Sequence, residues 1–111
     1  MARIVMQEAA LDDLERLYNF LAQYDEDAAL RAAKCIDEAI SQLAEYPELV
    51  PVLNGEYRVL SIPFGKRGYS TAHVYDADLD EVLILGIKHQ REEFYPFEIE
   101  FERDEDSELP E

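Results

Sequence analysis

The positively charged side chains of this sequence gather in its central third. The 111 residues include 26 acids and 10 bases, which gives a net charge of −16. Residues 57–91 hold 4 acids and 5 bases, whereas residues 1–56 hold 12 acids and 4 bases and residues 92–111 hold 10 acids and 1 base. Because Lys and Arg bind phosphates and acids repel them, only the central stretch of the sequence predicts a surface that receives an anion.

Three residues of this stretch have side chains suited to cleaving RNA without a metal ion. That reaction needs a base for the 2′-hydroxyl proton, an acid for the leaving oxygen and cations for the charge that develops on the phosphate. His89 is the candidate proton carrier, since its ordinary pKa near 6.5 leaves both forms present at neutral pH. Arg91 and Arg58 are the candidate catalytic cations.

Three further residues are candidates for binding a target or an anion. Lys66 and Arg67 lie together in a glycine-containing loop, and Tyr95 offers a ring that stacks on a base. The sequence leaves alternatives open for all these bases, namely surface exposure or internal ion pairs with Glu92, Glu93 or the acidic tail.

The sequence predicts neither a metal site nor a cofactor. Cys35 is the only cysteine, so the chain has no internal disulfide and no multi-thiolate site. Asp76, Asp78 and Asp80 imitate the first ligands of a calcium loop, but Glu81 stands where that loop needs its turn glycine.

Periodic apolar residues predict two helices after a short strand at residues 3–6. Apolar side chains recur at steps of three and four from residue 8 to about residue 23, and again to about residue 46. Asp25 is a suitable N-cap between them, and so short a link makes the helices an antiparallel hairpin. The predicted core-facing residues are Leu11, Leu14, Tyr18 and Leu21, widened by Leu17 and Phe20, and then Ala29, Ala33, Ile36, Ile40 and Leu43.

Three strand-like runs follow, at residues 56–62, 69–75 and 81–88. Short links make them an antiparallel meander, and the last run is apolar on both faces, which is typical of a central strand. His73 is expected to be packed or half-exposed within the second run. With the helical hairpin on one face, the chain is predicted to have an α+β fold with a curled antiparallel sheet. Paired in this way, the strands would bring Arg58 near the other cations.

The length and the hydropathy pattern predict one cytoplasmic domain. At 111 residues the chain has room for a single core, and no apolar run reaches the roughly 18–20 residues that a membrane span needs. The N-terminus also lacks the pattern of a signal peptide. The expected domain covers residues 1–95, followed by an acidic C-terminal extension at residues 96–111.

Three local segments resemble a known family, and they occur within the same order of elements, a strand, a helical hairpin and a three-strand meander. The segment EAALDDLE at residues 8–15 is similar to the family's opening helix, and LAEYP at residues 43–47 to the close of its helical hairpin. The segment VLILGIKHQRE at residues 82–92 is similar to the last strand of its plasmid-stabilisation branch. Over residues 1–95 the chain resembles the RelE/ParE toxins, within the ParE-like branch.

The resemblance implies the toxin component of a type II toxin–antitoxin system. Such a toxin would stop growth by binding a target such as DNA gyrase, and a cognate antitoxin would neutralise it in a hetero-oligomer. The alternatives are a RelE-like ribosome-dependent mRNA endonuclease, or a non-toxic relative that keeps only partner binding and covers its basic strip with its own acidic tail. Nuclease members are typically basic enough to dock on ribosomal RNA, so the net charge of −16 favours the gyrase-type toxin or a weakened one.

Overall fold

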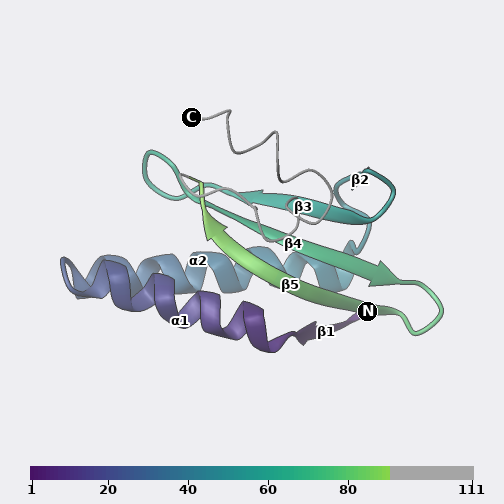
Figure 1. Ribbon diagram of the computed structural model, residues 1–111, viewed down its shortest axis with the longest axis horizontal. Coiled ribbons are helices and arrows are strands. Elements are labelled where there is room, and N and C mark those ends of the chain that lie inside the picture. Colours follow the sequence, from purple (N-terminus) through teal and green to yellow (C-terminus); the bar gives the residue numbers. More distant parts are fainter. Residues whose placement is uncertain (91–111) are drawn as a thin grey trace, which may run out of the picture.

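Two helices cover one face of a five-stranded sheet (Figure 1). The computed structural model describes residues 1–90. Its elements are β1 (Arg3–Met6), α1 (Glu8–Ala22), α2 (Glu26–Glu45), β2 (Val52–Leu53), β3 (Tyr57–Ile62), β4 (Tyr69–Asp76) and β5 (Glu81–His89). The predicted α+β architecture is confirmed. The predicted domain boundary at residue 95 lies outside the described residues.

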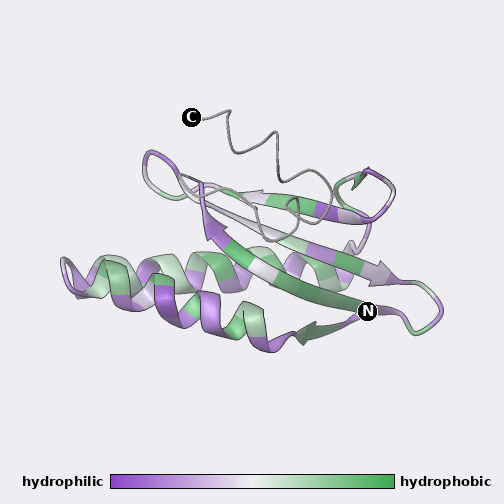
Figure 2. Cartoon of the chain, viewed as in Figure 1, coloured by the Kyte–Doolittle hydropathy of each residue, from purple (hydrophilic) through white to green (hydrophobic). Residues whose placement is uncertain are grey.

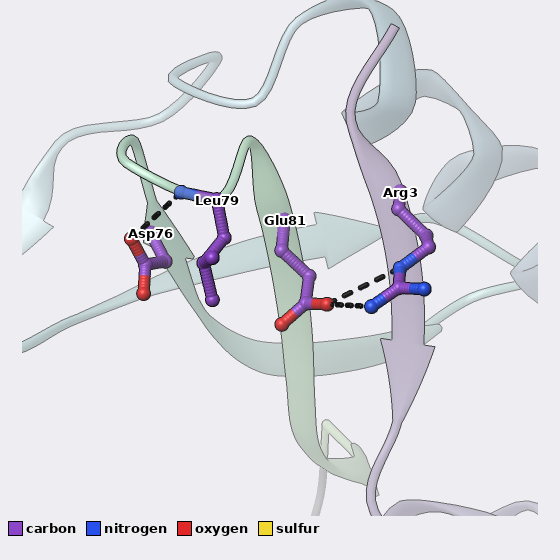
Figure 3. A network of polar contacts seen from close by, with 4 residues as sticks. All are labelled: Arg3, Asp76, Leu79 and Glu81. Atoms are coloured by element: carbon purple, nitrogen blue, oxygen red, sulfur yellow. Dashed lines mark hydrogen bonds and ion pairs between the residues drawn. The ribbon is translucent and has the colours of Figure 1, made fainter.

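The sheet is mixed, with strand order β1-β5-β4-β3-β2. The meander of β3, β4 and β5 is antiparallel, as predicted, and β5 is an interior strand that lies between β1 and β4. β1 instead runs parallel to β5, with Ile4 beside Val82. The two-helix crossover between β1 and the meander permits this parallel pairing, which a tight turn would forbid. Arg3, the first residue of β1, forms an ion pair with Glu81, the first residue of β5, close to the β4–β5 turn (Figure 3).

The helical hairpin begins and turns where the sequence predicts. The side chain of Asp25 caps α2 by accepting a hydrogen bond from the backbone N–H of Ala28 at 3.0 Å. Glu26 and Asp27 add negative charge to the first turn of α2, where the helix dipole favours it. Only three residues, 23–25, separate the two helices, so they return antiparallel along the same face of the sheet.

The core lies between the hairpin and the sheet. Figure 2 shows that β5 is apolar along most of its length, and Val82, Ile84 and Ile87 are completely buried there. In α2 the predicted core residues are buried, except that Ala32 takes the place of Ala33. In α1 the buried residues are Ala10 and Leu17, whereas Leu11 and Phe20 are 50% and 59% exposed. Leu14 and Leu21 pack against the core as predicted, so the stripe differs from the prediction at Leu11 and Phe20, and Ala10 is buried instead of Leu11.

No helix among residues 1–90 is both long enough and apolar enough to cross a membrane.

Candidate functional site

A groove of about 780 Å³ lies between α1 and the loop that joins β3 to β4. Its basic side chains come from three parts of the chain, with Arg16 on α1, Lys66 and Arg67 in the loop, and His89 at the end of β5. The remaining lining is mainly apolar and aromatic, contributed by Leu17, Phe20, Leu21, Phe64 and Tyr69. Three of the six predicted site residues, Lys66, Arg67 and His89, therefore come together.

Two glycines shape the loop that carries Lys66 and Arg67. Gly65 has a φ of +63° and Gly68 a φ of +110°, in the left-handed region where side chains are disfavoured. A Cβ on Gly68 would stand 2.3 Å from the carbonyl oxygen of Ile62, so this position accepts only glycine. The backbone N–H of Gln90 donates to the carbonyl of Gly68 at 2.9 Å, which ties the loop to the end of β5.

Aromatic contacts hold His89 against the floor of the groove. His89 is the strand partner of Tyr69, and their rings meet edge to face with centroids 5.5 Å apart. The ring of Phe64 lies 6.1 Å from Tyr69 on the loop side. Burial raises the pKa of the Tyr69 hydroxyl above its ordinary value, with a smaller contribution from Cys35, so this hydroxyl stays neutral at physiological pH.

Asp13 fixes α1 to the end of β5 that carries His89. One oxygen of its carboxylate accepts a hydrogen bond from the backbone N–H of Ile87 at 2.9 Å. The other lies 3.8 Å from the ammonium of Lys88 and 3.6 Å from the guanidinium of Arg16. Within residues 1–90 the pairing of β1 with that edge of β5 ends at Met6, so the carboxylate satisfies a backbone donor that this pairing leaves open.

Arg58 does not join the groove, which corrects the expectation that it would converge with the other cations. On β3, Arg58 pairs with His73, whereas Ile62 pairs with the groove residue Tyr69. Arg58 and Ile62 are four residues apart, which corresponds to about 13 Å along a strand. The guanidinium donates to the carbonyl of Val50 and forms an ion pair with a Glu48 carboxylate oxygen 3.6 Å away. These contacts hold the guanidinium of Arg58 against the segment that follows α2, away from the groove.

The other two candidates, Arg91 and Tyr95, lie outside the described residues. Conversely, α1 contributes Arg16 and Phe20, which sequence reasoning did not assign to the site. Their spacing of four residues places them on one face of a helix, and an exposed aromatic beside a cation on such a face is the signal that could have identified them.

The groove combines cations with an aromatic floor, and His89 is the only histidine among its lining residues in positions 1–90. No carboxylate is among its lining residues in positions 1–90. Nor do these positions contain a cluster of three or more metal-ligating His, Cys, Asp or Glu residues. The arrangement is suited to binding an anionic partner that also offers apolar groups.

Comparison with solved structures shows a shared fold. A chromosomal ParDE toxin–antitoxin system from P. aeruginosa contains a chain that matches with a TM-score of 0.64 and 22% identity, over 80% of this chain and 96% of that one. A chain of the intact E. coli RelBE toxin–antitoxin complex matches with a TM-score of 0.57 and 13% identity, over 79% of this chain and 95% of that one. No curated protein sequence matches the chain.

The sequence itself matches a family profile across most of its length. The profile describes the ParE toxin of the type II toxin–antitoxin system parDE, and it matches residues 4–94. This span contains every helix and strand that forms the groove, and it confirms the resemblance that the three sequence segments carry. The chain belongs to the ParE toxin family of type II toxin–antitoxin systems.

Proposed function

We propose that this protein inhibits growth by binding a cytoplasmic target such as DNA gyrase through the groove, and that a cognate antitoxin neutralises it. The observation that carries the proposal is the character of the groove. Its cations lie over an aromatic floor, and Arg58, one of the two arginines predicted to act with His89, is engaged elsewhere. Cations over aromatic rings are suited to binding a partner, and among residues 1–90 the lining offers no carboxylate as a second acid–base group beside His89.

Lys66 and Arg67 are the residues through which to test the groove. Neither forms an ion pair with another of the residues 1–90, so their charges face the groove without an internal partner in that part of the chain. Arg31 and Lys34 are the matched control, since they are exposed on α2 and do not line the groove.

A supercoiling assay with purified gyrase tests the target. The full chain should inhibit supercoiling, and the Lys66→Glu/Arg67→Glu variant should lose at least about tenfold in potency. The Arg31→Glu/Lys34→Glu variant has the same change in net charge and should keep the potency of the unmodified chain. Absence of inhibition at excess protein, or equal loss in both variants, would count against the groove as a gyrase-binding surface.

An mRNA endonuclease is the second candidate, favoured by the position of His89 beside two loop cations. A nuclease would cut ribosome-bound mRNA, and His89→Ala and Arg91→Ala would each abolish the cleavage. Cleavage that persists in both variants would remove these residues as catalytic groups. The gyrase assay and the ribosome assay thus give opposite results for the two candidates.

Exposed apolar side chains on the helical hairpin support the antitoxin part of the proposal. Leu11, Phe20, Tyr24 and Leu30 are between 50% and 72% exposed, and Phe20 and Tyr24 form an edge-to-face pair. An extended or helical antitoxin segment laid across the hairpin would bury them. Co-expression of the cognate antitoxin should restore growth, and the antitoxin should copurify with the chain. Growth inhibition that the antitoxin leaves unchanged would contradict this assignment.

A further inference from the structure

The groove opens where the described part of the chain ends. His89 lines the groove, and Gln90 is hydrogen-bonded to Gly68, next to the loop cations. Residues 91–111 continue from this point with 10 acids and 2 bases. They also contain four aromatic residues, which are Phe94, Tyr95, Phe97 and Phe101.

We propose that the groove is a docking site for acidic peptides that carry aromatic side chains, and that residues 91–111 of the same molecule are its resident occupant. Charge supports this assignment, because the cations Arg16, Lys66 and Arg67 line the groove while the C-terminal segment has a net charge of −8. Shape and polarity support it too, because the rings of Phe20, Phe64 and Tyr69 offer an apolar surface to the aromatic residues of the segment.

The position of the segment favours binding within one molecule. An extended chain spans roughly 3.3 Å per residue, so residue 97 lies at most about 23 Å from Gln90, which directly follows the groove residue His89. A segment joined to the same chain by a short connection meets its binding site at an effective concentration of about the millimolar range. A weak peptide–groove contact would therefore be occupied in the intact chain without a second copy.

The docking site has a consequence for every other ligand of the groove. A target or antitoxin that uses the same surface must displace the segment, and the free energy of the internal contact is subtracted from the affinity of the incoming partner. This inference holds whichever target the toxin has, because it concerns only the groove and the chain's own C-terminal segment.

A tryptophan reporter tests the contact in the full chain, which contains no tryptophan of its own. In the Phe97→Trp chain, docking should shift the emission to shorter wavelength and protect the indole from acrylamide, a neutral quencher. Adding Lys66→Glu/Arg67→Glu should shift the emission to longer wavelength and raise the quenching constant at least about threefold. The Arg31→Glu/Lys34→Glu control should change neither quantity, and circular dichroism should show that all variants are folded.

Two further measurements decide between the remaining outcomes. The Phe101→Trp chain repeats the experiment, so that a disturbance caused by one reporter does not decide the result. If the groove substitutions leave the quenching constant unchanged for both tryptophan reporters, the proposal is overturned. A blue shift that grows between about 1 and 100 μM protein would identify a second copy as the occupant and would also overturn it. Neither fluorescence measurement involves gyrase, so a result against the docking proposal can be distinguished from a result against gyrase as the target.

Discussion

His73 is completely buried on β4, and neither of its ring nitrogens has a hydrogen-bond partner among the described residues. Its pKa falls from 6.5 to about 4, mainly because burial disfavours the charged ring; the backbone of Thr71 opposes this shift and the positive charge of Arg58 adds to it. The fold therefore requires the neutral ring. From the sequence, His73 is expected to be a packed or half-exposed strand residue, and its complete burial agrees with the first of these.

Acidification should destabilise the protein through His73. The folded-state pKa lies below the unfolded-state value, so the stabilising effect of the neutral ring is complete above about pH 6.5 and is lost as the pH falls toward 4. The loss amounts to at most about 3 kcal/mol. Urea unfolding of His73→Leu should show a smaller decrease in the free energy of unfolding between pH 7 and pH 4.5 than the unmodified chain. Equal decreases would show that the acidic groups alone set the pH dependence.

Residue types reveal the cations of the groove but not how each is engaged. Lys66, Arg67 and His89 are predictable because their chemistry is visible in the sequence and the turn between β3 and β4 is short. Arg58 has the same chemistry, yet its partners Val50 and Glu48 belong to an irregular segment whose path no periodicity encodes. Charge can be predicted from the sequence, whereas the partner of a charge depends on tertiary contacts.

At the scale of elements, the contact between α1 and β5 depends on one carboxylate. Asp13→Ala would leave the buried N–H of Ile87 without its partner and should lower the free energy of unfolding by about 1–3 kcal/mol. Asp12→Ala removes the same charge from an exposed neighbouring position and should change it by less than about 0.5 kcal/mol. Chemical denaturation measures both variants. If both lose the same stability, the hydrogen bond to Ile87 contributes nothing measurable.

The loop between β3 and β4 offers a second comparison of matched positions. Gly65→Ala meets no atom within 4 Å and should cost only the strain of a positive φ, about 1–2 kcal/mol. Gly68→Ala adds a collision with the backbone of Ile62 and Phe64, so its loss should be about 3 kcal/mol or more. Thermal unfolding midpoints measure the difference. Similar midpoints for the two variants would mean that the loop adjusts to the added methyl group.

The helices and the meander follow from local periodicity, but the pairing of distant strands does not. The steps of three and four along α1 and α2 and the β-rich runs of β3, β4 and β5 are properties of neighbouring residues. The parallel pairing of β1 with β5 joins residues 78 positions apart, and β2 has only two residues, too few for any pattern. Burial on α1 likewise depends on how the helix is rotated against β5, which explains why Leu11 was misplaced.

At the scale of the whole molecule, the net charge of −16 opposes compaction because like charges repel one another. Raising the NaCl concentration from about 0.01 M to 0.15 M shortens the Debye length from about 30 Å to about 8 Å. We therefore expect the thermal midpoint of the folded chain to rise with salt. The Arg31→Glu/Lys34→Glu variant carries a net charge of −20, since two positive charges become negative, and its midpoint should rise more steeply.

The same increase in salt should weaken the proposed contact in the groove, because opposite charges attract there. The Phe97→Trp chain separates the two effects in one sample, with the thermal midpoint rising while the indole becomes more accessible to acrylamide. A midpoint that falls with salt would mean that local pairs such as Arg3 with Glu81 outweigh the overall repulsion. Opposite responses of the fold and of the groove would show that the acidic residues destabilise the compact chain as a whole and are attracted to one surface of it.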